Sequence, residues 1–487
     1  MTADATTTES ASTEASDGAQ EQGGTPEGPT PSGGHPTGGP GLIGDSSRIA
    51  IASAMSRITG LLRIVVAASV LGSTVLGDLF VAINVLPLTL YDVFAGSAIS
   101  SVLVPPLVRL LGGSPSAGSA SADDTAAARR FSANALGLIC ASMAVVAAGA
   151  VLGRSLLSDA LTAGVSPDLR PDATAVAGTL LLLIIPQLVL YAAIGVLVSV
   201  QHARRRFLLP SAAPIVENLG LLATIAVVWR RYGGGLEVDE APLGLILTLA
   251  IGSGLSVSAH ALLQYVGARR AIGRIGLGLH WRHPDISALA GPTRSSFGWS
   301  SVIALRQFAL VVAAGFAGAG GVQAFEIATL AYFIPVGLIG RPIASAALPR
   351  LAGSNGGPAS LLTGYRTTMR LAAWIAVPAG ATLVLLSGPV ADIIGQGRFS
   401  GPEATRMLTY GLAGLGLGAA SDALFEIARQ TTMAHGVGNG VARSTWIRGG
   451  VAVVGIPLVV SVLDGPAVLL GLGLTVSLGD LAALAVA

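Results

Sequence analysis

The chain has 487 residues, of which 52% are hydrophobic and only 11% are charged, and its mean hydropathy is +0.71. An average soluble domain carries about 25% charged residues, so this composition argues against a soluble protein and indicates an integral membrane protein. The formal net charge of +2 gives no indication of nucleic-acid binding. The single cysteine, Cys140, excludes an intrachain disulfide and a cysteine-based metal site.

The first 46 residues are rich in Thr, Ser, Gly, Pro and Glu and contain no Arg. A secretory signal peptide needs a basic start followed by an apolar core, and this segment has neither. Its composition buries too little apolar surface to support a fold. We therefore predict a disordered cytosolic tail over residues 1–46.

The rest of the chain is a succession of long apolar stretches. A membrane-spanning helix needs about 20 mostly apolar residues, and on that basis we predict an all-α integral membrane fold with about twelve transmembrane helices. The second span is too long for one straight crossing, and Pro87 is expected to break or bend it. The expected spans are Arg48–Gly72, Asp78–Leu110, Phe131–Gly153, Thr174–Val200, Leu208–Trp229, Pro242–Gly267, Ser296–Gly318, Val322–Leu348, Met369–Ile393, Thr405–Ala428, Ile447–Leu463 and Pro466–Val486.

The arginines indicate the orientation of these helices. The chain has no Lys, and 18 of its 28 arginines lie in one set of alternate loops, whereas six lie in the other set. Cytoplasmic loops carry the excess of basic residues. Both termini are therefore expected in the cytoplasm, in a multi-pass protein of the inner (plasma) membrane.

The two halves of the chain resemble each other in layout. In each half the second helix contains an internal proline, Pro87 or Pro335, and ends at a proline-rich basic exit followed by a long loop. Two lobes related by an axis along the membrane normal would produce this pattern. We predict two six-helix lobes, residues 47–290 and 291–487, around a central cavity.

Four arginines lie inside the expected spans: Arg57, Arg63, Arg306 and Arg341. A central Arg costs about 2.5–3.5 kcal/mol on insertion scales, so these side chains are expected to face water, a partner or a ligand. Arg57 and Arg63 lie about 9 Å apart along the helix and about 120° apart around it, which suits a cavity wall. Together the four predict a cavity of positive potential that binds a phosphate-bearing cargo.

Other roles stay open for these and neighbouring residues. Each arginine could instead snorkel or pair with a carboxylate. His260 is interpreted as a packing residue or, alternatively, a proton relay, and Glu217 and Asp480 could serve proton or sodium coupling. The sequence contains no nucleophile–base pair, metal-ligand cluster or Walker motif, so we predict a non-enzyme without a cofactor. The candidate carboxylate partners of the arginines are Asp92, Glu217, Asp422 and Glu426.

The segment from Ser56 to Arg63 resembles the first-helix signature of the MurJ/MviN lipid II flippases, which belong to the superfamily that includes the MATE exporters. Further motifs follow in register, and the resemblance covers nearly everything from Arg48 onward. The chain is thus identified as a member of this family. The other motifs are Gly77–Ala82, Arg206–Asn218, Pro335–Pro349 and Leu386–Phe399.

This resemblance implies a MATE-like bundle that moves an undecaprenyl-diphosphate-linked peptidoglycan precursor from the inner to the outer leaflet by alternating access. It implies substrate-binding roles for Arg57 and Arg63, as ligands of the diphosphate, and for Asp78. The implied partners are a lipid-linked diphosphate substrate and membrane lipids, with no nucleic acid and no required protein partner.

The chain also departs from the family pattern. Several positions that are usually charged in the family carry other residues here, and Arg306 and Arg341 are expected to restore the lost positive charge. The alternative cargo is another polyprenyl-linked glycan or an amphiphilic natural product. A membrane scaffold that recruits a partner through the tail and an integral-membrane glycosyltransferase are the non-transport alternatives. The departures stand at Ile64, Tyr91, Asp92, Gly96 and Leu330.

Overall fold

The computed structural model of the chain describes residues 40–94, 96–111, 121–280, 290–335, 357–434 and 438–486. The chain divides into two units, Met1–Ser46 and Ser47–Ala487, and the following description concerns the second unit. Nearly all of the predicted tail lies outside the described residues. Within the described ranges every regular element is a helix, which confirms the all-α class.

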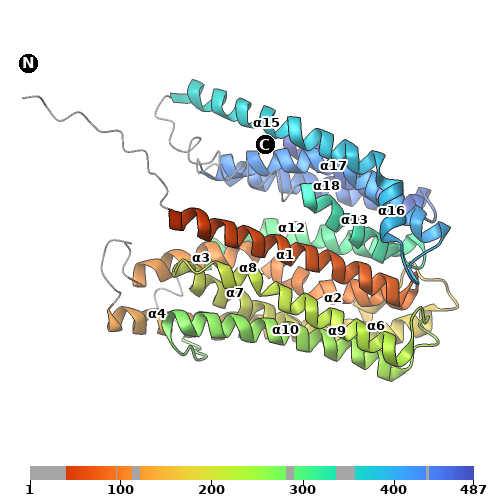
Figure 1. The fold of residues 1–487 in the computed structure, drawn as a ribbon, viewed down its shortest axis with the longest axis horizontal. Coiled ribbons are helices and arrows are strands. Elements are labelled where there is room, and N and C mark those ends of the chain that lie inside the picture. Colours follow the sequence, from red (N-terminus) through yellow and green to blue (C-terminus); the bar gives the residue numbers. More distant parts are fainter. Residues whose placement is uncertain are drawn as a thin grey trace, which may run out of the picture. The chain divides into compact units, whose positions relative to one another are not determined.

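The first half of the second unit forms a bundle of helices that lie side by side (Figure 1). Helix α10 packs on α7 and α9, while α6 packs on α2 and α10. The elements are α1 (Pro40–Leu71), α2 (Val75–Phe94), α3 (Gly96–Leu110), α4 (Ala122–Leu152), α5 (Arg154–Leu161), α6 (Arg170–Ile184), η1 (Ile185–Gln187), α7 (Leu188–Ala203), α8 (Leu208–Ala212), α9 (Pro214–Tyr232) and α10 (Leu243–Ile272).

The second half forms another bundle, in which α17 packs on α13, α15 and α19, and α18 packs on α19. Stretches of small residues allow this close packing: a Cβ added to Gly414 of α17 would lie 2.7 Å from a backbone oxygen of α19. The elements are α12 (Ala290–Ala314), η2 (Gly315–Ala317), α13 (Gly321–Pro335), α15 (Gly357–Leu385), α16 (Ser387–Ile394), α17 (Pro402–Ala434), α18 (Gly438–Val462) and α19 (Ala467–Val486).

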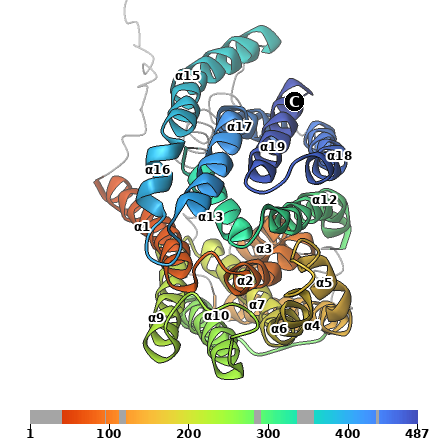
Figure 2. The same ribbon diagram turned by 90° about the vertical axis from the view of Figure 1, so that its right-hand side faces the viewer.

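The two bundles meet along α2, α12 and α13. Helices α12 and α13 both contact α2, and α12 also contacts α3. Figure 2 shows α12 and α13 between the N-terminal helices and the group α17 to α19. A single apolar core continues through this boundary, from Phe80 and Ile83 on α2 to Leu310 on α12 and Phe325 on α13. The boundary is therefore a packed interface over part of its length.

Eleven helical segments of the described chain are long and apolar enough to cross a membrane, and they coincide with eleven of the twelve expected spans. The expected span Val322–Leu348 is described only as α13, which ends at Pro335, and residues 336–356 lie outside the described residues. Large apolar side chains stay exposed on these helices, such as Trp374 at 81% of its surface. Such exposed apolar surface is expected where a helix faces lipid.

Pro87 does not break the second span. Helix α2 continues through Pro87 to Phe94, and α3 begins at Gly96. Proline is tolerated inside transmembrane helices because neighbouring groups can satisfy the carbonyl that the proline leaves unbonded. Pro87 therefore lies inside a continuous helix, and Ala95, between α2 and α3, lies outside the described residues.

Candidate functional site

Two arginines of α1, Arg57 and Arg63, lie close to the middle of a membrane-spanning segment. The apolar part of α1 runs from Ile51 to Leu71, so Arg63 is two residues from its central residue, or about 3 Å along the axis. Arg57 lies about 6 Å from the centre on the other side. The Arg57 side chain is exposed and the Arg63 side chain is half-buried. Both charges are thus held at membrane depth.

Helix α9 fixes this part of α1. The side-chain amide of Asn218 donates to the Ser56 carbonyl oxygen at 3.1 Å and to the Thr59 hydroxyl at 3.0 Å. A Cβ added at Gly60 would lie 3.6 Å from that amide nitrogen, so the two helices approach closely where α1 has its small residues. Helix α1 therefore packs on α9 through Ser56 and Gly60. Asn218 thereby holds the helical turn between the two arginines against α9.

Arg63 makes no hydrogen bond or ion pair with the residues that the structure describes. It lines a narrow cavity of about 20 Å³ together with Phe80 and Asn84 of α2 and Leu221 of α9. A guanidinium group carries five N–H donors and is always charged. A half-buried guanidinium without a partner at this depth is available to a ligand, which distinguishes Arg63 from the paired arginines described below.

The titratable groups close enough to Arg63 for an electrostatic interaction lie on both bundles. Arg63 exerts an electrostatic effect on Glu217 of α9 and Tyr191 of α7. It also acts on Glu326 of α13. Glu326 accepts a weak hydrogen bond from Gln307 of α12 at 3.4 Å. Glu326 and Gln307 therefore connect the surroundings of Arg63 to the C-terminal bundle.

Glu217 belongs to a chain of buried hydrogen bonds. Its two carboxylate oxygens contact the Tyr191 hydroxyl at 2.9 Å and the His260 Nδ1 at 2.8 Å. The other ring nitrogen of His260 lies 3.3 Å from the Gln264 amide nitrogen, and Gln264 in turn accepts from Gln201 at 2.7 Å. Sequence reasoning named Glu217 and His260 only as weak candidates, because they lie 43 residues apart and share no spacing.

Asp78 is placed at the boundary of the two bundles. It is buried at the start of α2, and its carboxylate accepts the backbone N–H groups of Gly320 at 2.8 Å and Gln323 at 2.9 Å. The Gln323 side chain donates back to the Gly72 carbonyl oxygen at 2.8 Å. Asp78 therefore caps the N-terminus of α13, where the helix dipole favours a negative charge.

Further backbone contacts surround the turn between α1 and α2. The Arg398 N–H donates to the Ser69 carbonyl oxygen at 2.8 Å. Gly320 has a φ of +91°, and an added Cβ would lie 2.9 Å from the Cβ of Ser73, so only glycine fits there. We call these contacts the α1–α2 clasp, formed by Ser69, Gly72, Ser73, Asp78, Gly320, Gln323 and Arg398.

The C-terminal bundle contains a larger polar cavity of about 330 Å³, which we call the C-terminal cavity. Arg448 of α18 donates to Asp422 of α17 at 2.8 Å and lies 3.2 Å from Asp480 of α19. The Arg448–Asp480 contact is poorly aligned, since neither of the two atoms has a hydrogen-bond partner. The cavity is lined by Val302, Ile303, Arg306, Gln307, Leu310, Phe325, Thr329, Tyr332, Phe333, Leu415, Asp422, Phe425, Glu426, Arg429, Thr445, Arg448, Gly449 and Val476.

Arg306 is the least satisfied of the arginines in this cavity. Its nearest carboxylate is Asp480 at 3.7 Å, and it makes no hydrogen bond with the described residues. By contrast, Arg429 donates to Glu426 at 2.7 Å and 2.8 Å. Thr329 lines the same cavity with a buried hydroxyl that has no partner. The cavity wall therefore presents unused donors beside its internal ion pairs.

The predicted site residues are thus only partly brought together. Arg57 and Arg63 share α1, whereas Arg306 lines the C-terminal cavity, which is distinct from the narrow cavity at Arg63. Asp78 lies in the clasp, beside a third cavity of about 280 Å³ that is mostly apolar. Arg341 lies outside the described residues.

Sequence reasoning also missed one intramembrane arginine. Arg448 was counted among the cytoplasmic loops, but it lies inside the membrane-spanning part of α18, Ala442–Val462. The count failed because Arg448 is the second residue of the expected span Ile447–Leu463, whereas α18 begins at Gly438, ten residues before Arg448. Gln323 and Glu326 were missed because neither carries a recognisable spacing.

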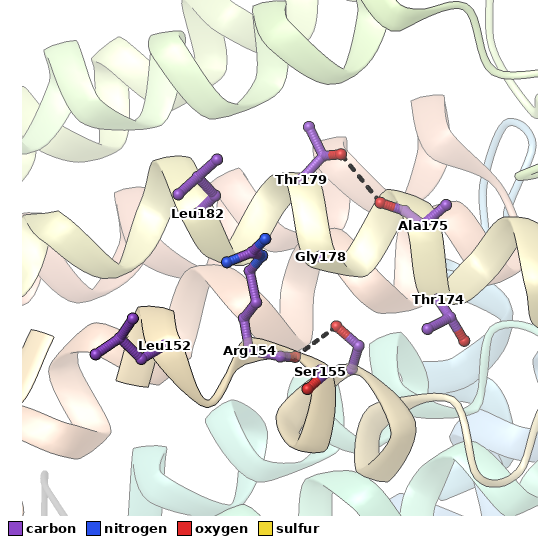
Figure 3. Close-up of a pocket in the computed structure, with 9 residues that line it drawn as sticks. Leu152, Arg154, Ser155, Thr174, Ala175, Gly178, Thr179 and Leu182 are labelled. Carbon is purple, nitrogen blue, oxygen red and sulfur yellow. Dashed lines mark hydrogen bonds between the residues drawn. The ribbon is translucent and has the colours of Figure 1, made fainter. Parts of the chain in front are cut away.

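The largest cavity described, about 460 Å³, lies between α5 and α6 (Figure 3). The hydroxyls of Ser158 and Thr179 donate to carbonyl oxygens of their own helices at 2.7 Å and 3.0 Å. Its leucines, Leu152 and Leu182, are exposed. Arg154 is its only charged residue. This groove resembles a lipid-facing surface more than a polar binding site.

Comparisons with known proteins agree on one family. A family model described as lipid II flippase MurJ matches residues 67–487. A probable lipid II flippase MurJ of Rhizobium meliloti is 25% identical over 379 residues, which are 74% of this chain and 65% of that protein. A probable lipid II flippase MurJ of Synechocystis sp. is 24% identical over 379 residues, 76% of this chain and 67% of that protein. The matches therefore span about two thirds of these relatives.

Solved structures show the same fold. A lipid II flippase MurJ in an inward closed conformation has a TM-score of 0.72 at 16% identity, over 90% of this chain and 86% of that one. An inward-facing MATE transporter of the MOP superfamily has a TM-score of 0.68 at 15% identity, over 88% of this chain and 92% of that one. The fold is therefore the MOP fold. The family match begins at residue 67, so Arg57 and Arg63 precede it.

Proposed function

This chain belongs to the lipid II flippase MurJ family, and we propose that it moves lipid II or a related polyprenyl-diphosphate glycan from the inner to the outer leaflet of the membrane. The observation that carries this proposal is Arg63, a half-buried guanidinium at the middle of a membrane span with no partner among the described residues. Such a charge is costly in lipid and is expected to have a ligand.

A diphosphate suits this group. Guanidinium groups bind phosphate through charge-assisted, often bidentate hydrogen bonds. In the proposal Arg57 and Arg63 hold the diphosphate, and Asn218 keeps their helical turn in place against α9. The long polyprenyl chain of such a cargo can stay in the lipid while the diphosphate enters the protein.

Arg306 and the C-terminal cavity would receive another part of the headgroup. Its volume of about 330 Å³ lies within the usual range of ligand pockets, about 300–1,000 Å³. The unused donors of Arg306 and Thr329 suit the polar groups of a glycan or peptide. We extend the proposal to Arg341 on the basis of its sequence position alone.

Transport by alternating access also requires a closed end. We propose that helices α1–α10 and α12–α19 act as two lobes, residues 47–290 and 291–487. The α1–α2 clasp would join them on the outer side, since both termini are proposed to be cytoplasmic. Asp78 would then act on the path of the cargo, because both its carboxylate oxygens are bound by backbone amides of α13.

The test is complementation of a bacterial strain depleted of its lipid II flippase. We expect the wild-type chain to restore growth and Arg63→Ala to abolish it at equal membrane abundance. Arg154→Ala serves as the matched control, because this arginine lies in the lipid-facing groove. Failure of the wild-type chain to complement would contradict lipid II as the cargo, and growth with Arg63→Ala would contradict the proposed site.

A further inference from the structure

The hydrogen bonds around His260 determine its protonation state. The Gln201 side-chain nitrogen faces three oxygens: the carbonyl oxygens of Leu197 and Gln264, each at 3.3 Å, and the Gln264 side-chain oxygen at 2.7 Å. A reversed Gln201 amide would point oxygen at oxygen. Gln201 is therefore a donor, and the Gln264 side-chain oxygen is its acceptor.

The orientation of Gln201 fixes that of Gln264, and Gln264 in turn fixes the hydrogen bond to His260. Because the oxygen of Gln264 faces Gln201, its amide nitrogen faces the His260 Nε2 at 3.3 Å and donates to it. An imidazole nitrogen that accepts a hydrogen bond carries no proton. His260 is thus neutral, and its Nδ1–H donates to Glu217 at 2.8 Å.

Glu217 therefore carries its negative charge without a cationic partner in direct contact. Its two oxygens accept from two neutral donors, Tyr191 and His260. The charged or titratable groups that act on Glu217 are His260 from α10, Tyr191 from α7 and Arg63 from α1. Arg63 is the only permanent cation of the three. Its counter-charges are Glu217, held beyond ion-pair distance, and Glu326 of α13.

We propose that the Glu217–His260 pair is a proton-binding site that sets the counter-charge of Arg63. Without an added proton, Glu217 and Arg63 together carry no net charge. When the pair takes up one proton, its own charge changes from −1 to zero, and the net charge of the pair and Arg63 together rises from zero to +1. An anion at Arg63 is then held more tightly. Loss of that proton restores the negative charge of the pair and weakens the binding of the anion at Arg63.

This inference rests on the proposed function, because the anion in question is the diphosphate of the cargo. It adds a driving reaction, in which each cargo would bind with uptake of a proton and leave as the proton is released. The chain of amides also links the pair to the end of α7.

The experiment measures the affinity of the purified full-length protein for a short-chain polyprenyl-diphosphate sugar between about pH 5 and about pH 8. The diphosphate of this probe is a diester and does not itself titrate in this range. We expect wild-type binding to weaken by about fivefold or more as the pH rises. The sign follows from the proton uptake, which adds positive charge at low pH.

Two variants of the pair and one matched control sharpen the test. Glu217→Gln imitates the protonated pair, so it should bind at the upper pH as tightly as the wild type does at the lower pH. His260→Gln should bind with little dependence on pH. His202→Gln removes another half-buried histidine of the same bundle, one that stacks on Phe207 outside this network, and it should keep the wild-type slope.

The outcomes separate this inference from the proposed function. If the wild type fails to bind the probe, or if Arg63→Ala binds it equally well, the proposed function fails. If the wild type binds through Arg63 but shows no pH slope, or if Glu217→Gln keeps the wild-type slope, only the proton site is overturned. Calorimetry in buffers of different ionisation enthalpy gives a second measure, with net proton uptake expected for the wild type and none for Glu217→Gln.

Discussion

The two bundles both bury charge inside membrane-spanning helices but neutralise it in different ways. In the C-terminal bundle Asp422, Glu426 and Asp480 each lie within 4 Å of an arginine, at 2.8, 2.7 and 3.2 Å. In the N-terminal bundle Glu217 is held by two neutral donors instead. Arg63 of that bundle is left without a direct partner among the described residues.

The paired charges of the C-terminal bundle stabilise the packing of its helices, whereas the charge of Arg63 is available to a ligand. Arg448 ties α17 and α19 to α18 and lies over the Phe425 ring at 3.9 Å. Helices in lipid gain little from the hydrophobic effect against each other, so such polar contacts specify their packing. Arg63 makes no such contact with the described residues. The free-energy cost of burying its charge is therefore not offset by an interaction that stabilises the bundle. We therefore expect that removing Arg448 lowers stability, whereas removing Arg63 abolishes function and leaves stability nearly unchanged.

The largest effect on stability is expected from Arg448→Ala. The substitution leaves Asp480, which is 1% exposed, with the Tyr332 hydroxyl at 2.7 Å and Arg306 as its remaining cation at 3.7 Å, and breaking a buried ion pair costs about 3–5 kcal/mol. Thermal unfolding of the purified protein in detergent measures this loss. Arg63→Ala is the matched comparison and should unfold near the wild-type temperature. Equal losses in the two variants would show that the bundles do not differ as described.

A double variant tests the assignment of that loss. Asp480→Asn removes the charge that Arg448→Ala leaves unpaired, so the two substitutions together should recover part of the stability. Simple addition of the two losses would contradict an ion pair between these residues, since residues in contact are expected to couple.

The next largest effect is expected from a change in the contacts that join the two bundles. Asp78→Ala removes both acceptors of the Gly320 and Gln323 amides, and hydrogen bonds to a charged group contribute about 1.5–3 kcal/mol. Loosening of the clasp should increase thiol labelling of Ser73→Cys in a Cys140→Ala background. Asp92→Ala is the control, because Asp92 is an exposed carboxylate of the same helix. Unchanged labelling in Asp78→Ala would show that the clasp is held by other contacts.

Most of the membrane architecture could be predicted from the sequence, because each crossing demands about 20 apolar residues. Eleven spans were recovered in this way. The continuation of α2 through Pro87 could not be predicted, since it depends on how the surroundings accommodate the proline. A proline signals a missing donor, but only the folded environment decides whether the helix bends, breaks or continues.

The site was predictable only where a residue is conspicuous by itself. Arg63 stands out because a charge in an apolar segment is rare. Its lack of a partner could not be foreseen, because it depends on the distances to Glu217 and Glu326 on other helices. Arg306, Arg448 and Asp480 meet from three helices, and no local spacing in the sequence indicates such a meeting.

A smaller effect on stability is expected from a substitution where the two bundles approach each other closely. Gly320→Ala places a Cβ 2.9 Å from Ser73 and at a φ of +91°, where an L-residue costs about 1–2 kcal/mol. Gly450→Ala is the matched control, since a Cβ there meets nothing within 4 Å and the residue lies in helix α18. The control should be neutral or stabilising by up to about 1 kcal/mol. Equal unfolding temperatures for the two variants would contradict the close contact at the clasp.

The smallest effect is expected within the C-terminal bundle itself, from Arg429→Ala. Arg429 pairs with Glu426 three residues earlier on the same helix, and its side chain is 32% exposed, against 15% for Arg448. Pairs of this spacing contribute about 0.2–0.5 kcal/mol, and Glu426 keeps the Gln430 amide as a donor at 2.9 Å. Thermal unfolding should therefore hardly change. A loss approaching that of Arg448→Ala would mean that the arginines around the C-terminal cavity stabilise the bundle as one network, in which exposure does not decide the contribution of each member.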